Sequence, residues 1–279
     1  MKNRHGLCRY IPADVRAIVR RRSGFGCVIC GVAIITYEHF DPLFADATTH
    51  DPAGITLLCG HHQNESTKGL LSKETIAAAN AKPYCHQQGH AQSMFDLGGQ
   101  QPPTLVLGTT EVRVVGAVLR INGSPVVQVQ APEATSSRWR LSATFPDRGG
   151  NVLCRIVENE LQVDSGNFDL VQEANRFEIR DGERSVVLKM ELEAPRMLRI
   201  VRFRWITERA SVEILDRCPS CAVSGGLCSV CSFLGPHEDR RRGWLRLRAP
   251  NSELTLEECQ FYSDTAGLQV SGAGIRMGG

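Results

Sequence analysis

Cysteine and histidine residues suited to binding a metal ion lie in two short clusters near the start of the chain. The first cluster is the pair Cys27 and Cys30 in the tight-turn sequence GCVICG, and the second is Cys59 with His61 and His62 in LLCGHH. Thiolate sulfur and imidazole nitrogen are the usual ligands of tetrahedral Zn²⁺ in structural sites. The spacing predicts a structural zinc ion bound by Cys27, Cys30, Cys59 and His62.

A carboxylate and an imidazole lie next to each other between the two clusters, in the sequence YEHFDP. These groups belong to Glu38 and His39. In metal-assisted cleavage of a phosphodiester, a carboxylate helps to hold a divalent cation, and an imidazole takes a proton from the attacking water. The pair is therefore a candidate catalytic site, and the alternative is a structural pair on a zinc-containing binding module.

A second set of four cysteines lies near the C-terminal end of the chain, in the sequences CPSC and CSVC. Four thiolates can close one tetrahedral zinc site, and they leave no open coordination position for chemistry. We expect a structural Zn²⁺ here, with free thiols or a redox pair as the alternatives. The four residues are Cys218, Cys221, Cys228 and Cys231. The remaining cysteines lack partners at ligand spacing and are expected to be packed thiols: Cys8, Cys85, Cys154 and Cys259.

Two helices are predicted to flank the first pair of clusters. In IPADVRAIVRRR, apolar residues recur with the period of a helix, and the arginines lie away from that stripe. The second helix is predicted in SKETIAAANA, where Ser72 is a suitable N-cap and Pro83 follows the end. The apolar stripe of the first helix is Ile11, Val15, Ile18 and Val19, and the arginines off the stripe are Arg16, Arg20 and Arg21.

Residues 96–103, a Gly- and Pro-containing segment, are predicted to be a linker, and the hydrophobic pattern changes to a period of two after them. Apolar residues then alternate with polar ones in several runs that are separated by turn sequences. Residues 104–215 are therefore expected to form an all-β domain, either a sandwich or a solenoid-like stack. Residues 216–279 hold the second cysteine set and further strands. The predicted fold class is α+β, with residues 1–95 as the first module.

Composition excludes several classes of protein. Of the 279 residues, 42% are hydrophobic and 22% are charged, which excludes a chain that is disordered throughout. The sequence has no apolar run long enough for a membrane span, and its start lacks the apolar region of a signal peptide. A cytoplasmic protein without a membrane partner is expected, and in that reducing compartment cysteine pairs indicate metal sites before disulfides.

Positive charge is concentrated in two places although the formal net charge is only +2. Residues 1–22 contain seven Lys or Arg and a single acid, Asp14. Such a segment can neutralise phosphates of nucleic acid, and the alternative is a solvated helix face. The sequence RRRGWLRLR combines Arg with Trp244, which can stack on a base, but the alternation of leucines favours an ordinary strand.

Residues 8–83 resemble the HNH endonucleases with a ββα-metal core, and more narrowly a bacterial group with a cysteine-ligated structural zinc. The likeness lies in RYIPADVRAIVRRRSGFGCVICG, YEHFDP and GITLLCGHHQNESTKGLLSKETIAAANAKP. It implies a β-hairpin followed by a helix that supplies the last metal ligand. By this resemblance His39 is the general base, Glu38 is a ligand of the catalytic Mg²⁺ or another divalent cation, and DNA is the substrate.

The chain departs from the family pattern at two positions. Gly54 stands where the family has an asparagine that orients the general base. With no gap in the alignment, His62 matches the zinc histidine and Gln63 falls on the catalytic-metal histidine. The alternative register makes His61 the zinc ligand and His62 the catalytic one. Asn64 and His50 are further candidates for the catalytic metal site.

Two functions follow from these observations. The first is a metal-dependent HNH-type endonuclease in which Glu38, helped by Gln63 or His62, holds the cation and His39 is the general base. The second is a catalytically degenerate HNH-derived zinc module for DNA or protein binding, with self-association or a protein partner bound through the β-domain. On the second hypothesis, Gly54→Asn combined with Gln63→His is expected to restore cleavage.

Overall fold

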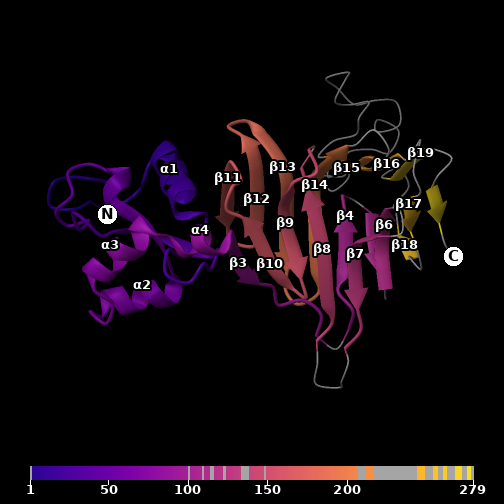
Figure 1. Cartoon of the computed structure of the whole chain (residues 1–279), viewed down its shortest axis with the longest axis horizontal. Helices are drawn as coiled ribbons and strands as arrows, with labels where there is room; N and C mark the ends of the chain where they lie inside the picture. Colours follow the sequence, from indigo (N-terminus) through magenta and orange to yellow (C-terminus); the bar gives the residue numbers. More distant parts are fainter. Residues whose placement is uncertain are drawn as a thin grey trace. The chain divides into compact units, whose positions relative to one another are not determined.

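The computed structural model describes most of the chain up to residue 206 and short segments beyond it. The described residues are 2–99, 101–108, 110–113, 116–121, 124–132, 138–147, 149–206, 211–215, 244–248, 254–256, 260–262, 268–271 and 275–277. Within them the fold is mixed α+β, and strands predominate (Figure 1). The cysteine set at residues 218–231 lies outside the described residues, and so does Cys259.

The chain forms two compact units. The first consists of Met1–Ser93, Gln162–Gln172 and Arg180–Glu183, and the second of Met94–Leu161, Glu173–Ile179 and Arg184–Gly279. The first unit therefore includes two segments from the middle of the sequence in addition to its N-terminal part. Among the described residues, no helix is both long and apolar enough to cross a membrane.

The first unit carries the helices and a short hairpin. Strands β1 (Ile35–His39) and β2 (Ile55–Cys59) pair in antiparallel register, with His39 opposite Ile55 and Glu38 opposite Thr56. Helix α2 follows β2 directly, which gives the order strand, strand, helix. The elements are α1 (Ala13–Ser23), β1 (Ile35–His39), the 3₁₀ turn η1 (Pro52–Gly54), β2 (Ile55–Cys59), α2 (Gly60–Thr67), α3 (Lys73–Ala81), α4 (Tyr84–Gln88) and β3 (His90–Met94).

Strand β2 forms the centre of this unit because all five of its residues are buried. Apolar residues from both sides pack against it in two clusters. One cluster contains Ile11, Val19, Ile55 and Leu57. The other contains Cys27, Val28, Leu58, Cys59 and Ile76, so the thiols of the predicted metal site are part of the core.

Helix α1 forms where the sequence predicts it, but its buried face differs from the prediction. Val19 is fully buried, whereas Ile18 is 43% exposed. Arg20, expected away from the core, is buried instead. Its guanidinium donates two hydrogen bonds to the carboxylate of Asp169, at 2.8 and 2.6 Å, and one to the Tyr37 hydroxyl at 2.8 Å. The prediction was wrong here because a carboxylate distant in sequence compensates the buried charge.

Helix α3 begins as predicted. The Ser72 hydroxyl accepts a hydrogen bond from the backbone N–H of Thr75, which satisfies one of the free donors at the helix start. Cys85 and Cys154 are buried, as expected of packed thiols, but Cys8 is exposed. The expectation for Cys8 was therefore wrong. The segment 96–103 contains the fully buried Leu97, which its Gly- and Pro-rich composition does not suggest.

The second unit is built from strands. Along one sheet the order is β20-β17-β6-β7-β8-β9, and along the other it is β13-β14-β15-β16-β19, with β4, β5 and β18 beside it. Most neighbours are antiparallel, but three pairs are parallel: β4 with β14, β16 with β19, and β17 with β20. The strands after β3 are β4 (Thr104–Leu107), β5 (Thr110–Arg113), β6 (Gly116–Ile121), β7 (Ser124–Gln130), β8 (Arg140–Pro146), β9 (Val152–Val157), β10 (Glu160–Asp164), β11 (Asp169–Glu173), β12 (Arg176–Gly182), β13 (Ser185–Glu193), β14 (Met197–Ile206), β15 (Ser211–Leu215), β16 (Trp244–Arg248), β17 (Leu254–Leu256), β18 (Gln260–Tyr262), β19 (Leu268–Ser271) and β20 (Ile275–Met277).

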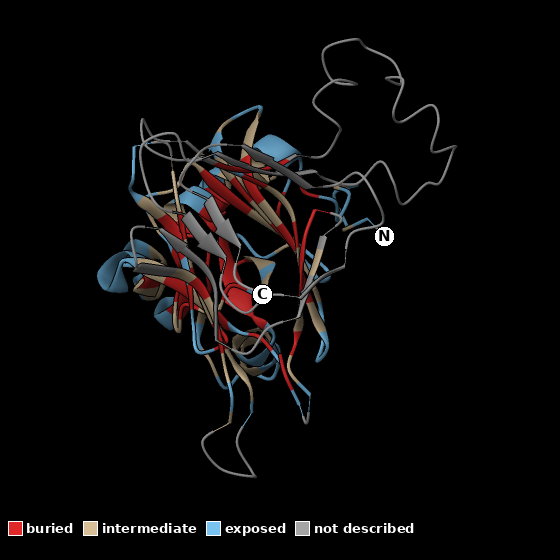
Figure 2. Cartoon of the chain, turned by 90° about the vertical axis from the view of Figure 1, so that its right-hand side faces the viewer, coloured by how far each residue is buried: buried red, intermediate tan, exposed pale blue. Residues whose placement is uncertain are grey.

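The core of the second unit lies between the inner faces of its sheets. Burial alternates along β8, where Leu141, Ala143 and Phe145 are buried and their neighbours are less so. This confirms the period of two that the sequence shows in this run. The rings of Phe145 on β8 and Phe203 on β14 meet edge to face at 5.2 Å, so the two sheets contact each other there. Figure 2 shows the buried positions along these strands in red.

Candidate functional site

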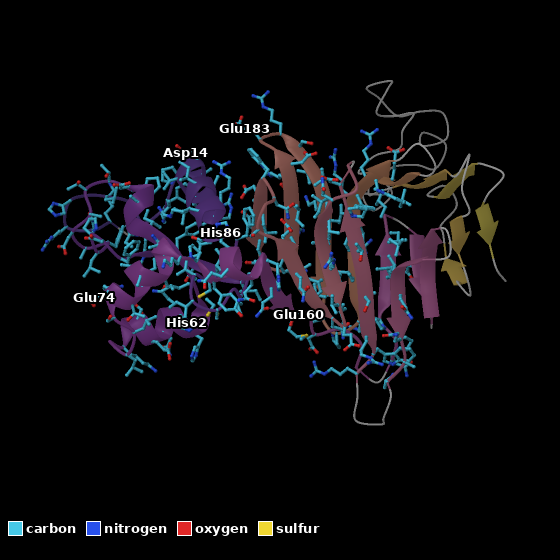
Figure 3. All side chains as sticks on the ribbon, in the orientation of Figure 1. Asp14, His62, Glu74, His86, Glu160 and Glu183 are labelled. Carbon is cyan, nitrogen blue, oxygen red and sulfur yellow. The ribbon has the colours of Figure 1, made fainter. Side chains whose placement is uncertain are left out.

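Three thiols and one imidazole converge in the first unit. The Nδ1 atom of His62 lies 3.4 Å from the sulfur of Cys27 and 3.2 Å from that of Cys59, and the sulfurs of Cys30 and Cys59 are 3.7 Å apart. All four ligand atoms lie within 4.8 Å of one another. Sulfur atoms lie beside His62 in Figure 3. The four side chains predicted from spacing could therefore hold one metal ion.

The local backbone brings Cys27 and Cys30 to the same point. The N–H of Cys27 donates to the carbonyl of Val32 at 2.9 Å, and the N–H of Gly31 donates back to the carbonyl of Cys27 at 2.8 Å. Gly31 has φ +78°, which a residue with a Cβ rarely adopts, so the turn depends on glycine there. This compact turn directs both thiols toward one side.

The other two ligands come from the junction of β2 and α2. Cys59 is the last residue of β2 and precedes the first residue of α2, and His62 lies in the first turn of that helix. The position of Cys59 is fixed by the burial of β2, since this residue is only 6% exposed. A hydrogen bond from the Cys30 thiol lowers the pKa of Cys27 to about 5, and the same bond raises the pKa of Cys30.

His61 points away from this cluster. Its Nε2 atom lies 3.3 Å from a carboxylate oxygen of Glu65, and its side chain is 73% exposed. Of the two neighbouring histidines, only His62 directs its Nδ1 atom to the sulfurs. Of the two registers that the sequence left open, the structure therefore has His62, and not His61, beside the three sulfurs.

The carboxylate of Glu38 is held by two nitrogen donors. The ammonium group of Lys73, at the start of α3, donates to Oε1, and the side-chain N–H of Gln63 on α2 donates to Oε2 at 2.8 Å. Lys73 also donates to the Ser66 hydroxyl at 3.0 Å. The side chain of Glu38 is only 18% exposed. Both oxygens of the predicted metal ligand are thus engaged by protein groups.

The amide of Gln63 is oriented by contacts at both of its ends. Its Oε1 atom accepts a hydrogen bond from the Thr36 hydroxyl at 3.3 Å, while its nitrogen faces Glu38. A metal ligand would have to present the oxygen instead, because the amide nitrogen has no free lone pair to offer. Among the described residues, Glu38 belongs to no group of three or more His, Cys, Asp or Glu side chains that could hold an ion. The arrangement therefore does not fit a divalent cation.

His39 makes a separate set of contacts. Its Nε2 atom lies 3.1 Å from Nδ1 of His50, and Nε2 of His50 lies 2.9 Å from the backbone carbonyl of Cys8. A carbonyl only accepts hydrogen bonds, so Nε2 of His50 carries a proton and Nδ1 of neutral His50 is an acceptor. Nε2 of His39 must then be the donor. The lone pair of neutral His39 is therefore on Nδ1.

The surroundings of His39 keep it neutral. The residue is 8% exposed, and burial together with the neighbouring His50 and Arg9 lowers its pKa below the ordinary value, although Glu38 acts in the opposite direction. The ring of Phe44 packs edge to face on His39 at 5.3 Å, and the guanidinium of Arg9 lies over that ring. A neutral imidazole near neutral pH is the state that a general base requires.

Gly54 lies too close to a neighbouring carbonyl to carry a side chain. A Cβ atom there would be 1.9 Å from the backbone oxygen of Asp41. The carbonyl of Gly54 also accepts a hydrogen bond from the N–H of Phe40 at 3.0 Å, which holds the two segments together. The asparagine that the HNH pattern places here could not be accommodated without a backbone shift.

The contacts that His50 makes with His39 and Lys73 with Glu38 were not predicted from the sequence. His50 was one of several candidates for a metal ligand, and Lys73 was only the first residue after a helix cap. Neither contact has a signal in spacing, because His50 comes from an irregular loop and Lys73 from the next helix. Their contacts with His39 and Glu38 arise from the tertiary fold alone.

Comparison with models of protein families, with curated proteins and with solved structures gave no match.

Proposed function

We propose that residues 8–83 form an HNH-type ββα module with a structural zinc ion, and that it is an endonuclease hydrolysing DNA phosphodiester bonds. The observation that carries this proposal is the chain of contacts from the Cys8 carbonyl through His50 to His39, which leaves Nδ1 of a neutral imidazole as a base. The order β1, β2, α2 and the Cys₃His cluster at the junction of β2 and α2 support it.

Zinc is the metal that best fits the Cys₃His cluster. Tetrahedral Zn²⁺ with Zn–S about 2.3 Å and Zn–N about 2.0–2.1 Å has ligand-to-ligand edges of roughly 3.5–3.8 Å. The observed separations of 3.2, 3.4 and 3.7 Å lie close to that range. Three soft thiolates also favour Zn²⁺ over Mg²⁺ or Ca²⁺. With four protein ligands the ion would have no open position, so its role would be to hold the Cys27 turn against α2.

The proposed reaction uses His39 as the general base. Water donates a proton to Nδ1 of His39 as its oxygen forms a bond to phosphorus, and the bond from phosphorus to the leaving oxygen breaks. The leaving alkoxide then takes a proton from solvent, and the His39 imidazolium returns its proton to solvent. Throughout, Nε2 of His39 keeps its hydrogen bond to His50. No step is routed through a divalent cation, because the contacts of Glu38 do not fit one.

A second candidate function is favoured by the contacts of Glu38 and Gly54. With both carboxylate oxygens engaged and no room for asparagine, the module would bind nucleic acid without cutting it. The second unit would then supply the activity, through self-association or a protein partner. This alternative predicts intact zinc and salt-sensitive DNA binding, since phosphate contacts release counterions.

Plasmid cleavage tests the first candidate against the second. The full-length protein is compared with His39→Ala at matched zinc content, in Mg²⁺, Mn²⁺ or Ni²⁺ and without added divalent ion. Cleavage by the parent, and its loss in His39→Ala, is the expected result. Equal cleavage by both proteins would refute the role of His39. No cleavage by either protein, with DNA binding that weakens as salt rises, would establish the second candidate instead.

A further inference from the structure

We propose that the ammonium group of Lys73 takes the place of the divalent cation at Glu38, so that this module binds no such ion there. The inference rests on the proposed function only in treating Glu38 as the acidic residue of the HNH-type site. It goes beyond that function because it assigns the charge that neutralises Glu38 to a side chain of the protein itself.

The geometry around Lys73 is that of a bound cation. Its ammonium group donates to Oε1 of Glu38 and, at 3.0 Å, to the hydroxyl of Ser66. The side chains of Lys73 and Glu38 are 33% and 18% exposed, so the pair is partly shielded from water. Shielding strengthens a charge-assisted hydrogen bond compared with one on an open surface.

The amide of Gln63 presents its nitrogen, and not its oxygen, to Glu38. Its N–H donates to Oε2 of Glu38, so the second carboxylate oxygen also faces a donor. Binding of a divalent cation between these groups would require the amide to turn over and give up its contact with Thr36. Two independent side chains would therefore have to rearrange before Glu38 could ligate an ion.

The position of Lys73 in its helix argues in the same direction. Lys73 is the first residue of α3, after the Ser72 cap. A positive charge at a helix N-terminus is unfavourable, because the first turn already carries partial positive charge. A lysine at this position is thus accounted for by its contact with Glu38 rather than by the helix.

Binding of Mn²⁺ to the zinc-loaded full-length protein tests the inference without depending on activity. Mn²⁺ is paramagnetic and broadens the amide signals of residues near its site, so a weak site is detected and located by NMR. The proteins compared are the parent, Lys73→Met, and Lys73→Met combined with Glu38→Gln. Lys68→Met, which removes an exposed lysine at the end of α2, is the matched control.

The expected result is broadening centred on Glu38 and His39 in Lys73→Met, with an affinity at least about tenfold higher than in the parent, a change of about 1.4 kcal/mol. At the Mn²⁺ concentrations that produce this broadening in Lys73→Met, the parent, the Lys68→Met control and the double variant should show none. Tight Mn²⁺ binding at Glu38 in the parent would overturn the inference, and so would the lack of any gain in Lys73→Met. Either result can be told apart from a failure of the proposed nuclease, which is decided by His39→Ala in the cleavage assay.

Discussion

At the scale of single residues, His50 determines which nitrogen of neutral His39 carries the proton. The contact order from the Cys8 carbonyl through His50 places the proton of neutral His39 on Nε2. A histidine thereby supplies the orienting contact that the HNH pattern assigns to an asparagine at the position of Gly54. His50 is thus a positioning residue for the proposed base.

Replacement of His50 should remove the contact that holds His39 in a single tautomer. In His50→Ala we expect a mixture of His39 tautomers in place of the Nδ1 lone-pair form, and cleavage slowed by about 10- to 100-fold, within the range that general-base catalysis contributes. The tautomers are distinguished by the ¹⁵N shifts of the ring at pH 8.5, where the imidazole is neutral. His50→Gln is a conservative variant whose side-chain carbonyl can accept a hydrogen bond from Nε2 of His39. It should recover part of the single-tautomer population and part of the cleavage rate. An unchanged His39 tautomer in His50→Ala would contradict this role.

The lowered pKa of His39 makes the stability of the first unit depend on pH. When the folded-state pKa lies below the ordinary value of about 6.5, the unfolded chain binds more protons in the window just below pH 6.5. The free energy of unfolding should therefore fall as pH falls through that window. We expect the stability advantage of the parent over His39→Gln, measured by urea denaturation, to shrink between pH 7 and pH 5.5. An advantage that grows as pH falls would show that the pKa is raised instead.

The crowding at Gly54 predicts that asparagine does not restore activity there. Because a Cβ would lie 1.9 Å from the Asp41 oxygen, Gly54→Ala should destabilise the protein by about 1–3 kcal/mol, as overpacking does in cores, and Gly54→Asn by at least as much. Thermal unfolding of both variants measures this cost. Gly60→Ala is the control, since a Cβ at Gly60 meets nothing within 4 Å. A revived nuclease in Gly54→Asn with Gln63→His would contradict this expectation.

At the scale of elements, the proposed zinc ion connects the Cys27 turn to the junction of β2 and α2. Loss of one ligand should therefore disorder that turn and α2 together, because structural zinc sites contribute folding free energy directly. In Cys59→Ala we expect about one fewer zinc per chain by elemental analysis, and loss of the amide signals of α2. Cys154→Ala removes a buried thiol of β9 and should keep the parent's zinc content.

At this scale, the sequence predicted the features that depend on residues close together in the chain or on a regular spacing. The helix after Ser72 was predicted because the cap and the periodic apolar residues are adjacent, and Cys27, Cys30, Cys59 and His62 were brought together as their spacing suggests. The prediction failed at Ile18 and Arg20. Periodicity places Ile18 on the apolar face, although this residue is exposed. The carboxylate of Asp169, which allows Arg20 to be buried, lies 149 positions away in the sequence. Such partners cannot be read from a local pattern.

At the scale of the whole molecule, the first unit depends on segments from the middle of the chain. Residues 162–172 belong to it, and they supply Asp169, the partner of Arg20. The guanidinium and carboxylate side chains are only 11% and 6% exposed. Removing one partner of such a buried pair costs about 3–5 kcal/mol, because the other charge is left without compensation.

This arrangement makes the contribution of Arg20 depend on how much of the chain is present. In the full-length protein, Arg20→Ala should lower the free energy of unfolding of the first unit by about 3–5 kcal/mol, measured by hydrogen exchange of β2 amides. A fragment of residues 1–95 lacks Asp169, so the guanidinium of its Arg20 has no carboxylate partner there and is expected to be exposed to solvent. We expect the fragment to be less stable than the same unit in the intact chain, and Arg20→Ala to change it by less than about 1 kcal/mol, as for an exposed arginine. If Arg20→Ala destabilised the fragment as much as the full-length protein, Arg20 would act within the N-terminal segment alone. The first unit would then end where the composition changes, near residue 95.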